Sequence, residues 1–151
     1  MNIRQYRNED WPRLCEIHDA ARCDELRASG LMDAFLRLEH AAVEEGLFDA
    51  QVVVAEIDGR VQGFAAYSEN ELTWLYCDPA AYRRGIGRAL LRRVIADCAS
   101  PLYAEVLVGN DAALALYLSE GFSVVRKVEG QLAGNEAYAA SAYYLRRGRA
   151  A

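Results

Sequence analysis

The chain has 151 residues, 53% of them hydrophobic and 26% charged, which suits one globular domain with a single core. Its formal net charge of −5 argues against the basic face that nucleic-acid-binding proteins present, so we expect no nucleic-acid partner. No apolar run approaches the roughly 20 residues that span a bilayer, and we expect no membrane attachment. The expected organisation is one domain over residues 1–151.

The four cysteines, Cys15, Cys23, Cys77 and Cys98, show no CxxC or His-paired zinc spacing. The amino terminus also lacks the basic-then-apolar pattern of a secretory signal. We therefore expect free thiols in a reducing cytoplasm and no metal site.

The first third of the chain predicts one short strand and two helices. Residues 2–6 show a weak strand pattern, which we interpret as an edge strand. Asp10 before Trp11-Pro12 supplies a cap and a first-turn proline, so a helix is expected to begin there. Apolar residues at helical spacing over 31–42 predict a second helix that ends at Gly46. Acidic residues concentrate in this region, at Glu16, Asp19, Asp24, Glu25, Asp33, Glu39, Glu44 and Glu45.

The middle and the end of the chain read mainly as strands. Residues 51–58 and 61–67 flank Asp58-Gly59, a hairpin turn signal, and a further strand follows over 71–77. Pro101 opens a strand over 102–108, and Asn110 then caps a helix. Two more strands are expected at 122–128 and 137–145, with a loop over 130–135.

The segment from Asp78 to Leu91 joins the strand at 71–77 to a helix. Gly85 and Gly87 have no Cβ, so a ligand can approach the backbone closely. The first amides of the helix have no intrahelical partner and lie at the positive end of the macrodipole. Such a corner suits a phosphate or pyrophosphate. Arginines at 83, 84 and 88 oppose the helix dipole, which a polyanionic ligand would explain; the alternative is a solvated helix start.

Two familiar phosphate loops fit this segment poorly. A dinucleotide fingerprint needs a third glycine, and a Walker loop ends in Gly-Lys-Ser/Thr, and neither is present. The segment instead resembles the acyl-CoA loop of the GNAT family of N-acetyltransferases, whose pattern is Arg/Gln-x-x-Gly-x-Gly/Ala after a strand. Tyr82 stands where the family has Arg or Gln. A second segment, from Glu105 through Asn110 and Tyr117 to Phe122, resembles another hallmark of the same family.

The resemblance implies an α/β fold with a single mixed, mostly antiparallel sheet of six to seven strands flanked by helices and splayed between its fourth and fifth strands. It implies acetyl-CoA as cosubstrate, with loop amides on the pyrophosphate and strand amides pairing with the pantetheine arm. The residues that it assigns to acetyl-CoA are Leu75, Tyr76, Cys77, Tyr82, Arg83, Arg84, Gly85, Ile86, Gly87, Arg88, Asn110 and Tyr117. For Asn110, capping of its helix alone is the alternative.

The resemblance also implies roles in catalysis. Tyr117 would protonate the departing thiolate; the alternative is a half-buried aromatic residue of an amphipathic helix. Glu105 would accept the amine proton directly or through water, unless it is a strand residue facing solvent, and Glu71 is the second candidate base. Cys77 has no histidine nearby in sequence, so direct transfer is expected rather than an acyl-enzyme.

The expected function is therefore acyl-CoA-dependent N-acetylation of a primary amine in a small molecule or a peptide. In the resembled family the first helices wall the acceptor site, so one or two of their acidic residues are expected to meet the amine. The alternative is a non-catalytic acyl-CoA-binding or sensing domain. A homodimer is left open, and the expected location is the cytoplasm.

Overall fold

The computed structural model describes residues 1–149, in which seven strands form one mixed sheet. The strands are β1 (Asn2–Gln5), β2 (Gln51–Ile57), β3 (Arg60–Tyr67), β4 (Glu71–Cys77), β5 (Leu102–Leu107), β6 (Phe122–Leu132) and β7 (Asn135–Arg147). The α-helices are α1 (Trp11–Ala28), α2 (Leu38–Glu44), α3 (Ile86–Asp97) and α4 (Asp111–Ser119). The strand order is β1-β2-β3-β4-β5-β7-β6, and only the β4–β5 pair is parallel within these residues. The predicted fold class is confirmed.

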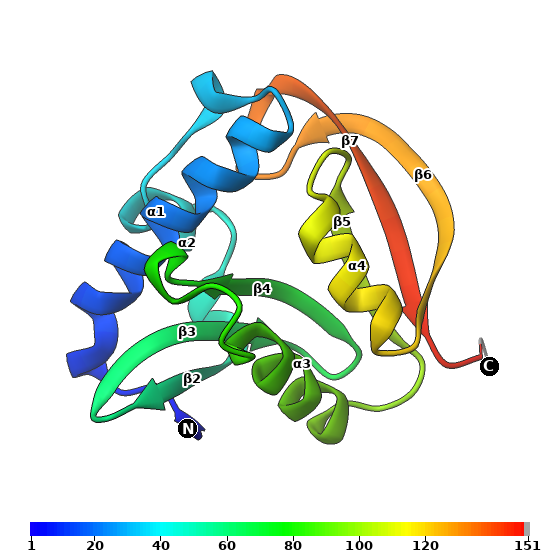
Figure 1. Ribbon diagram of the computed structural model, residues 1–151. Helices are drawn as coiled ribbons and strands as arrows, with labels where there is room; N and C mark the ends of the chain where they lie inside the picture. The colour runs from blue at the N-terminus through cyan, green and yellow to red at the C-terminus, as the bar shows by residue number, and fades with distance from the viewer. Residues whose placement is uncertain (150–151) are drawn as a thin grey trace.

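The sheet splays between β4 and β5. Two residue pairs join these strands, Glu71 with Tyr103 and Leu72 with Ala104, both at the start of β4. Beyond them the strands diverge, β4 running across the view of Figure 1 while β5 rises away from it. The remainder of β4 therefore has backbone groups without a partner on the β5 side, which is the splay that the sequence predicted.

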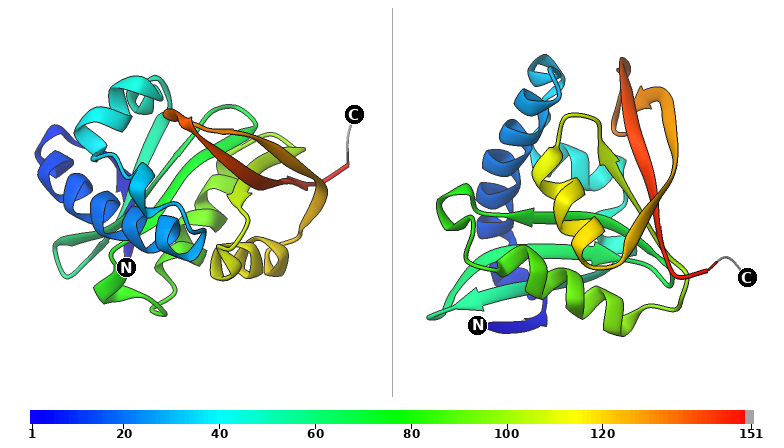
Figure 2. Two further views of the ribbon diagram at one scale, coloured as in Figure 1. Left: turned by 90° about the horizontal axis from the view of Figure 1, so that it is seen from above. Right: turned by 45° about the vertical axis from the view of Figure 1, so that its right-hand side comes forward.

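The two faces of the sheet have different cores. Helices α1 and α2 cover one face, where Leu14 and Leu38 pack with β-strand residues such as Phe64. On the other face, Leu90 of α3 and Tyr117 of α4 belong to a second cluster with residues of the sheet. Figure 2 shows the helices on both sides of the sheet. Burial of these apolar side chains is the dominant favourable contribution to folding.

Helix α3 lies unusually close to β3, and Gly63 makes this possible. A Cβ at Gly63 would lie 2.9 Å from Cγ2 of Ile86 and 3.1 Å from Cδ1 of Leu90. Because Ile86 begins α3, this contact fixes where the glycine loop delivers the helix to the sheet.

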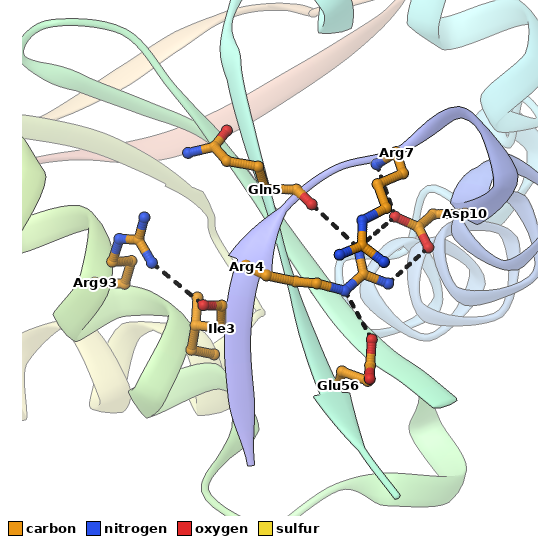
Figure 3. Close-up of polar contacts among 7 residues, drawn as sticks. All are labelled: Ile3, Arg4, Gln5, Arg7, Asp10, Glu56 and Arg93. Carbon is orange, nitrogen blue, oxygen red and sulfur yellow. Dashed lines mark hydrogen bonds and ion pairs between the residues drawn. The ribbon is translucent and has the colours of Figure 1, made fainter. Parts of the chain in front are cut away.

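The first strand is held by a cluster of ion pairs, shown in Figure 3. The guanidinium of Arg4 donates to both carboxylate oxygens of Asp10 at 2.9 Å and to Glu56 of β2 at 2.7 Å. Asp10 also accepts from the backbone N–H of Arg7 at 2.8 Å. The expectation that the Asp10 side chain caps α1 is therefore wrong, because that carboxylate serves Arg4 and the 3₁₀ turn Asn8–Asp10. The weakly predicted strand and the start of α1 at Trp11 are both confirmed.

The second helix was predicted too long. The chain forms a 3₁₀ turn at Met32–Ala34, is extended at Phe35 and Arg37, and becomes α-helical only over α2. The break places Phe35 against the cluster around Leu26 and Leu132, whereas Leu38 packs in the α1–α2 core. Helix α2 ends before Gly46, which adopts a left-handed φ of 65°.

The last two strands are longer than expected, and the expected loop over 130–135 is a tight turn. Strands β6 and β7 pair from Phe122 with Arg147 to Leu132 with Asn135, which leaves only two residues between them. The resulting hairpin extends along the open side of the splay (Figures 1 and 2). No helix within residues 1–149 is both long and apolar enough to cross a bilayer.

Candidate active site

A cavity of about 260 Å³ lies where β4 and β5 diverge. Its walls come from α1, α2, β4, β5, α4 and the β6–β7 hairpin. Five residues that the sequence singled out line it: Leu75, Tyr76, Glu105, Asn110 and Tyr117. Glu25 and Glu45, which belong to the acidic residues of the first helices that were expected to include a contact to the amine, also line it, as do His18, Arg22 and Trp74, which the sequence did not place in a site.

The glycine loop lies outside this cavity and leads into α3. Asp78 caps the 3₁₀ turn Pro79–Ala81 by accepting the N–H of Ala80 at 2.9 Å. Arg83 and Gly85 then adopt left-handed φ values of 65° and 79°, which turn the chain sharply into the helix. The first amides of α3 have no partner within the helix, and Gly85 just before them is exposed.

Gly87, in the first turn of α3, faces α4 and the end of β4. A Cβ there would lie 3.4 Å from Cδ2 of Leu116 and 3.6 Å from Sγ of Cys77, so a methyl group is accommodated and a longer side chain must point outward. Tyr82 is 48% exposed next to this loop. The loop therefore presents its backbone to solvent, as a site for an extended anion requires.

The three arginines beside the glycines are not equivalent. Arg88 pairs with Glu120 at the end of α4 and donates to Oγ of Ser119 at 2.9 Å. Arg83 and Arg84 are exposed and form no ion pair within residues 1–149. Two cations thus remain for a polyanion, while Arg88 joins α3 to α4.

Tyr117 projects from α4 into the cavity. Its side chain is 5% exposed, and its ring meets Phe122 edge to face at 5.2 Å between centroids. Burial, with a smaller effect from the charge of Glu25, raises the pKa of Tyr117 well above that of an ordinary phenol. Tyr117 is therefore protonated at neutral pH and able to act as a proton donor.

Asn110 makes two side-chain hydrogen bonds. Its Oδ1 accepts the N–H of Ala113 at 3.4 Å, so the predicted cap of α4 is confirmed. Its Nδ2 donates to Oε2 of Glu25 on α1 at 3.2 Å.

Glu25 links the two halves of the splayed sheet. Besides accepting from Asn110, it accepts the hydroxyl hydrogen of Tyr76, on β4, at 3.2 Å and pairs with Arg22 one turn away on α1. Nearby, a Cβ at Gly109 would lie 2.6 Å from the carbonyl oxygen of Ala28, so the end of α1 touches the β5–α4 turn directly. This bridge was not predicted, although the Arg22–Glu25 spacing is that of a helical ion pair.

The other carboxylates occupy different positions. Glu105 of β5 is exposed and lines the cavity, whereas Glu71 is exposed at the paired end of β4 and does not line it. Glu45 also lines the cavity, and its Oε2 is 2.7 Å from the position a Cβ would take at Gly134. Desolvation by the surrounding protein raises the pKa of Glu45 to about 7, although the nearby cation of Arg22 acts to lower it.

Cys77 stands at the end of β4 as a partly buried thiol. Burial raises the pKa of Cys77 to about 12, so the nucleophilic thiolate is scarce at neutral pH. All four cysteines are free thiols. Residues 1–149 also contain no cluster of three or more His, Cys, Asp or Glu side chains arranged to hold a metal ion.

A seven-stranded mixed sheet that splays beside a glycine loop and a buried tyrosine defines an acetyltransferase-like class of protein. A sequence profile of the acetyltransferase (GNAT) family matches residues 4–122. The chain belongs to this family.

Individual relatives agree with this family. N-alpha-acetyltransferase RimI of Mycobacterium tuberculosis (strain ATCC 25618 / H37Rv) is 41% identical over 98 residues, which are 57% of this chain and 61% of that protein. The chain spans less than two thirds of the length of the curated relatives that it matches.

Solved structures match over nearly the whole chain. The ribosomal-protein-alanine N-acetyltransferase of Brucella melitensis has a TM-score of 0.72 at 25% identity and covers 99% of this chain and 100% of its own. The structure of yncA from Salmonella typhimurium with its cofactor acetyl-CoA has a TM-score of 0.71 at 21% identity, covering 100% of this chain and 96% of its own.

Proposed function

We propose that this protein is an N-acetyltransferase that moves an acetyl group from acetyl-CoA directly to a primary amine. The observation that carries this proposal is the cavity at the β4–β5 splay, which has unpaired strand backbone on one wall and the buried Tyr117 on another. A thioester and an amine must be held close together for such a reaction, and this cavity offers one space for both.

The cosubstrate would lie along β4 and the glycine loop. The pantetheine arm resembles a peptide, and the free backbone of Leu75 to Cys77 offers it strand-like hydrogen bonds. Its pyrophosphate would lie at the amides that begin α3, within reach of the exposed Arg83 and Arg84. The family membership and the acetyl-CoA-bound structure of similar fold support acetyl-CoA as the cosubstrate.

Tyr117 is the residue that we assign to the departing thiolate. The phenol is protonated at neutral pH, so it has a proton to give to sulfur as the carbon–sulfur bond breaks. An amide of β4 would stabilise the oxyanion of the tetrahedral intermediate.

Glu105 is the carboxylate that we assign to the acceptor ammonium, and it is the first candidate for accepting its proton. Glu71 has less support, because it lies at the paired end of β4, away from the cavity. A covalent acetyl-cysteine intermediate has no support, because the raised pKa of Cys77 disfavours its thiolate.

The acceptor class is tested directly by incubating the protein with acetyl-CoA and a panel of amines while free thiol is followed. The panel contains a peptide with a free amino-terminal alanine, the same peptide with a blocked amino terminus and an internal lysine, and a small diamine. We expect thiol release that depends on one of these acceptors.

Two outcomes would count against the proposal. Acetyl-CoA binding in calorimetry without turnover on any acceptor would favour an acyl-CoA-binding domain. Failure to bind acetyl-CoA at all would contradict both the acetyltransferase and the acyl-CoA-binding domain. A homodimer and a cytoplasmic location stay predictions from the sequence.

A further inference from the structure

His18 lies on the inner face of α1 at the wall of the cavity. Its side chain is 2% exposed, and its ring lies 5.0 Å from the ring of Tyr76 and 5.8 Å from that of Trp74. All three residues line the cavity. A polar ring in such an apolar place needs either two hydrogen-bond partners or a ligand.

Asp19 fixes the tautomer of His18. Oδ1 of Asp19 accepts the backbone N–H of Leu38, at the start of α2, at 2.9 Å, and Nδ1 of His18 lies 3.0 Å from the same oxygen. A carboxylate oxygen accepts only, so in the neutral ring Nδ1 carries the hydrogen and donates it to Asp19. The lone pair is then on Nε2.

The ring is neutral near pH 7. Burial lowers the pKa of His18, while the adjacent Asp19 opposes this effect in part. The other charges that face the ring are Arg22 and Glu25 of α1, and the phenol of Tyr76 faces it from β4.

Nε2 of His18 is open to the cavity. It makes no hydrogen bond within residues 1–149, and the only fully buried side-chain nitrogen or oxygen without a partner among them is Oγ of Ser29. Nε2 must therefore reach open space, and the open space at this ring is the cavity that the residue lines.

We propose that His18 is a catalytic residue whose Nε2 accepts a proton from the ammonium group of the acceptor. This inference rests on the proposed acetyltransferase function and refines it, with Glu105 holding the ammonium and His18 taking its proton. The arrangement of a carboxylate on Nδ1 and a free lone pair on Nε2 is the one that orients histidine bases in general.

The protons balance in this scheme. The ammonium first gives one proton to Nε2, and the neutral nitrogen then forms its bond to the acetyl carbon. As the carbon–sulfur bond breaks, sulfur receives a proton from Tyr117, and the nitrogen gives up a second proton that restores the phenol. His18 releases the first proton to solvent, so one proton ends on the thiol and one in water.

Other groups on the cavity wall suit this role less well. Glu25 already accepts from Tyr76 and Asn110 and pairs with Arg22, which leaves it little capacity for another proton donor. Glu45 lies against the β6–β7 turn at Gly134 and near the cation of Arg22.

The tautomer is tested by nitrogen-15 NMR of the intact protein, which contains two histidines. His40 is exposed and outside the cavity, so its signals are assigned by comparison with His40→Gln. We expect hydrogen on Nδ1 of His18, a titration midpoint below the ordinary value of about 6.5, and a shift of the Nε2 signal when an accepted amine binds. The proposal would be overturned if the hydrogen were on Nε2, or if saturating amine left the chemical shift of Nε2 unchanged.

The kinetic test compares His18→Gln with the matched control His40→Gln. General base catalysis contributes roughly 10²- to 10⁴-fold, so kcat of His18→Gln should fall by about that factor while KM for acetyl-CoA is unchanged. In the parent, kcat should also fall as pH drops through the pKa of His18, because the protonated ring cannot accept; this limb should be absent in His18→Gln.

The outcomes separate the two proposals. Equal kcat in parent and His18→Gln, with both folded, contradicts the role of His18 and leaves the acetyltransferase intact. No turnover by the parent on any amine contradicts the acetyltransferase itself. If His18→Gln does not fold, the NMR of the parent protein decides the question alone.

Discussion

The two walls of the proposed active site, which extends beyond the cavity along the glycine loop, are built in different ways. The cosubstrate wall comes from one continuous stretch, β4 with the loop and α3, whose turn is made by the backbone at Arg83 and Gly85. The acceptor wall assembles side chains from distant segments, such as Glu25 of α1 with Asn110, 85 residues away. A contiguous backbone motif can be recognised in a sequence, whereas a cluster of side chains exists only after the fold brings its members together.

The cosubstrate wall is tested most severely by Gly87→Glu. The new side chain adds bulk and a like charge where the pyrophosphate would lie, and like-charge contacts in an interface cost several kcal/mol. We expect the variant to fold and its affinity for acetyl-CoA in calorimetry to fall by more than about a hundredfold, roughly 2.7 kcal/mol.

Gly87→Ala is the matched control for this variant. Its methyl group would make contacts of 3.4 and 3.6 Å with neighbouring side chains, so the fold should accept it. Undiminished affinity in Gly87→Glu would show that the pyrophosphate does not lie at this loop.

Tyr117→Phe tests the residue that projects from α4 into the cavity. The ring and its contact with Phe122 are kept, and only the hydroxyl is lost. If the phenol protonates sulfur, kcat should fall by roughly 10²- to 10⁴-fold while KM for acetyl-CoA and the melting temperature change little. The measurement must be made where chemistry limits turnover, and an unchanged kcat there would remove Tyr117 as the acid.

Most of the fold could be predicted from the sequence, because strand alternation, hairpin turns and helix caps are local signals. The error at residues 31–46 has a physical cause. Phe35 and Leu38 keep helical spacing along the chain, yet they pack in different clusters, and the extended backbone at Phe35 and Arg37 separates them. Periodicity alone cannot tell one core from two.

The candidate site was predictable only in part. Asn110 and Tyr117 belong to a recognisable motif, and the structure brings both to the cavity with Glu105. His18 and Glu25 carry no such motif, because their positions depend on how α1 packs against β4 and the β5–α4 turn. Glu25 appeared only as one of many acidic residues in the first helices.

The bridge between the walls is tested by Tyr76→Phe, which removes the hydroxyl that donates to Glu25 at 3.2 Å. A hydrogen bond to a charged group contributes about 1.5 to 3 kcal/mol, and this one is partly accessible. We expect the free energy of unfolding to fall by about 1 to 2 kcal/mol in a denaturant titration.

Tyr103→Phe is the control for this variant. Tyr103 stacks on Tyr144 and its hydroxyl makes no hydrogen bond within residues 1–149, so its loss should change stability by less than about 0.5 kcal/mol. Equal stabilities of the two variants would show that the Tyr76–Glu25 contact does not hold the walls together.

The smallest effect is expected at Tyr82, where the chain departs from the family pattern. Tyr82 is half exposed beside the glycine loop, and burial together with the facing carboxylate of Asp24 raises the pKa of its phenol. Tyr82→Arg places a cation at an exposed position that faces Asp24 of α1 and lies beside the expected pyrophosphate. If loop amides make most of the contacts with the anion, the exchange should leave acetyl-CoA affinity equal to that of the parent or slightly higher. A tenfold loss in calorimetry, about 1.4 kcal/mol, would mean that the tyrosine ring itself contacts acetyl-CoA, and that side chains as well as backbone build the cosubstrate wall.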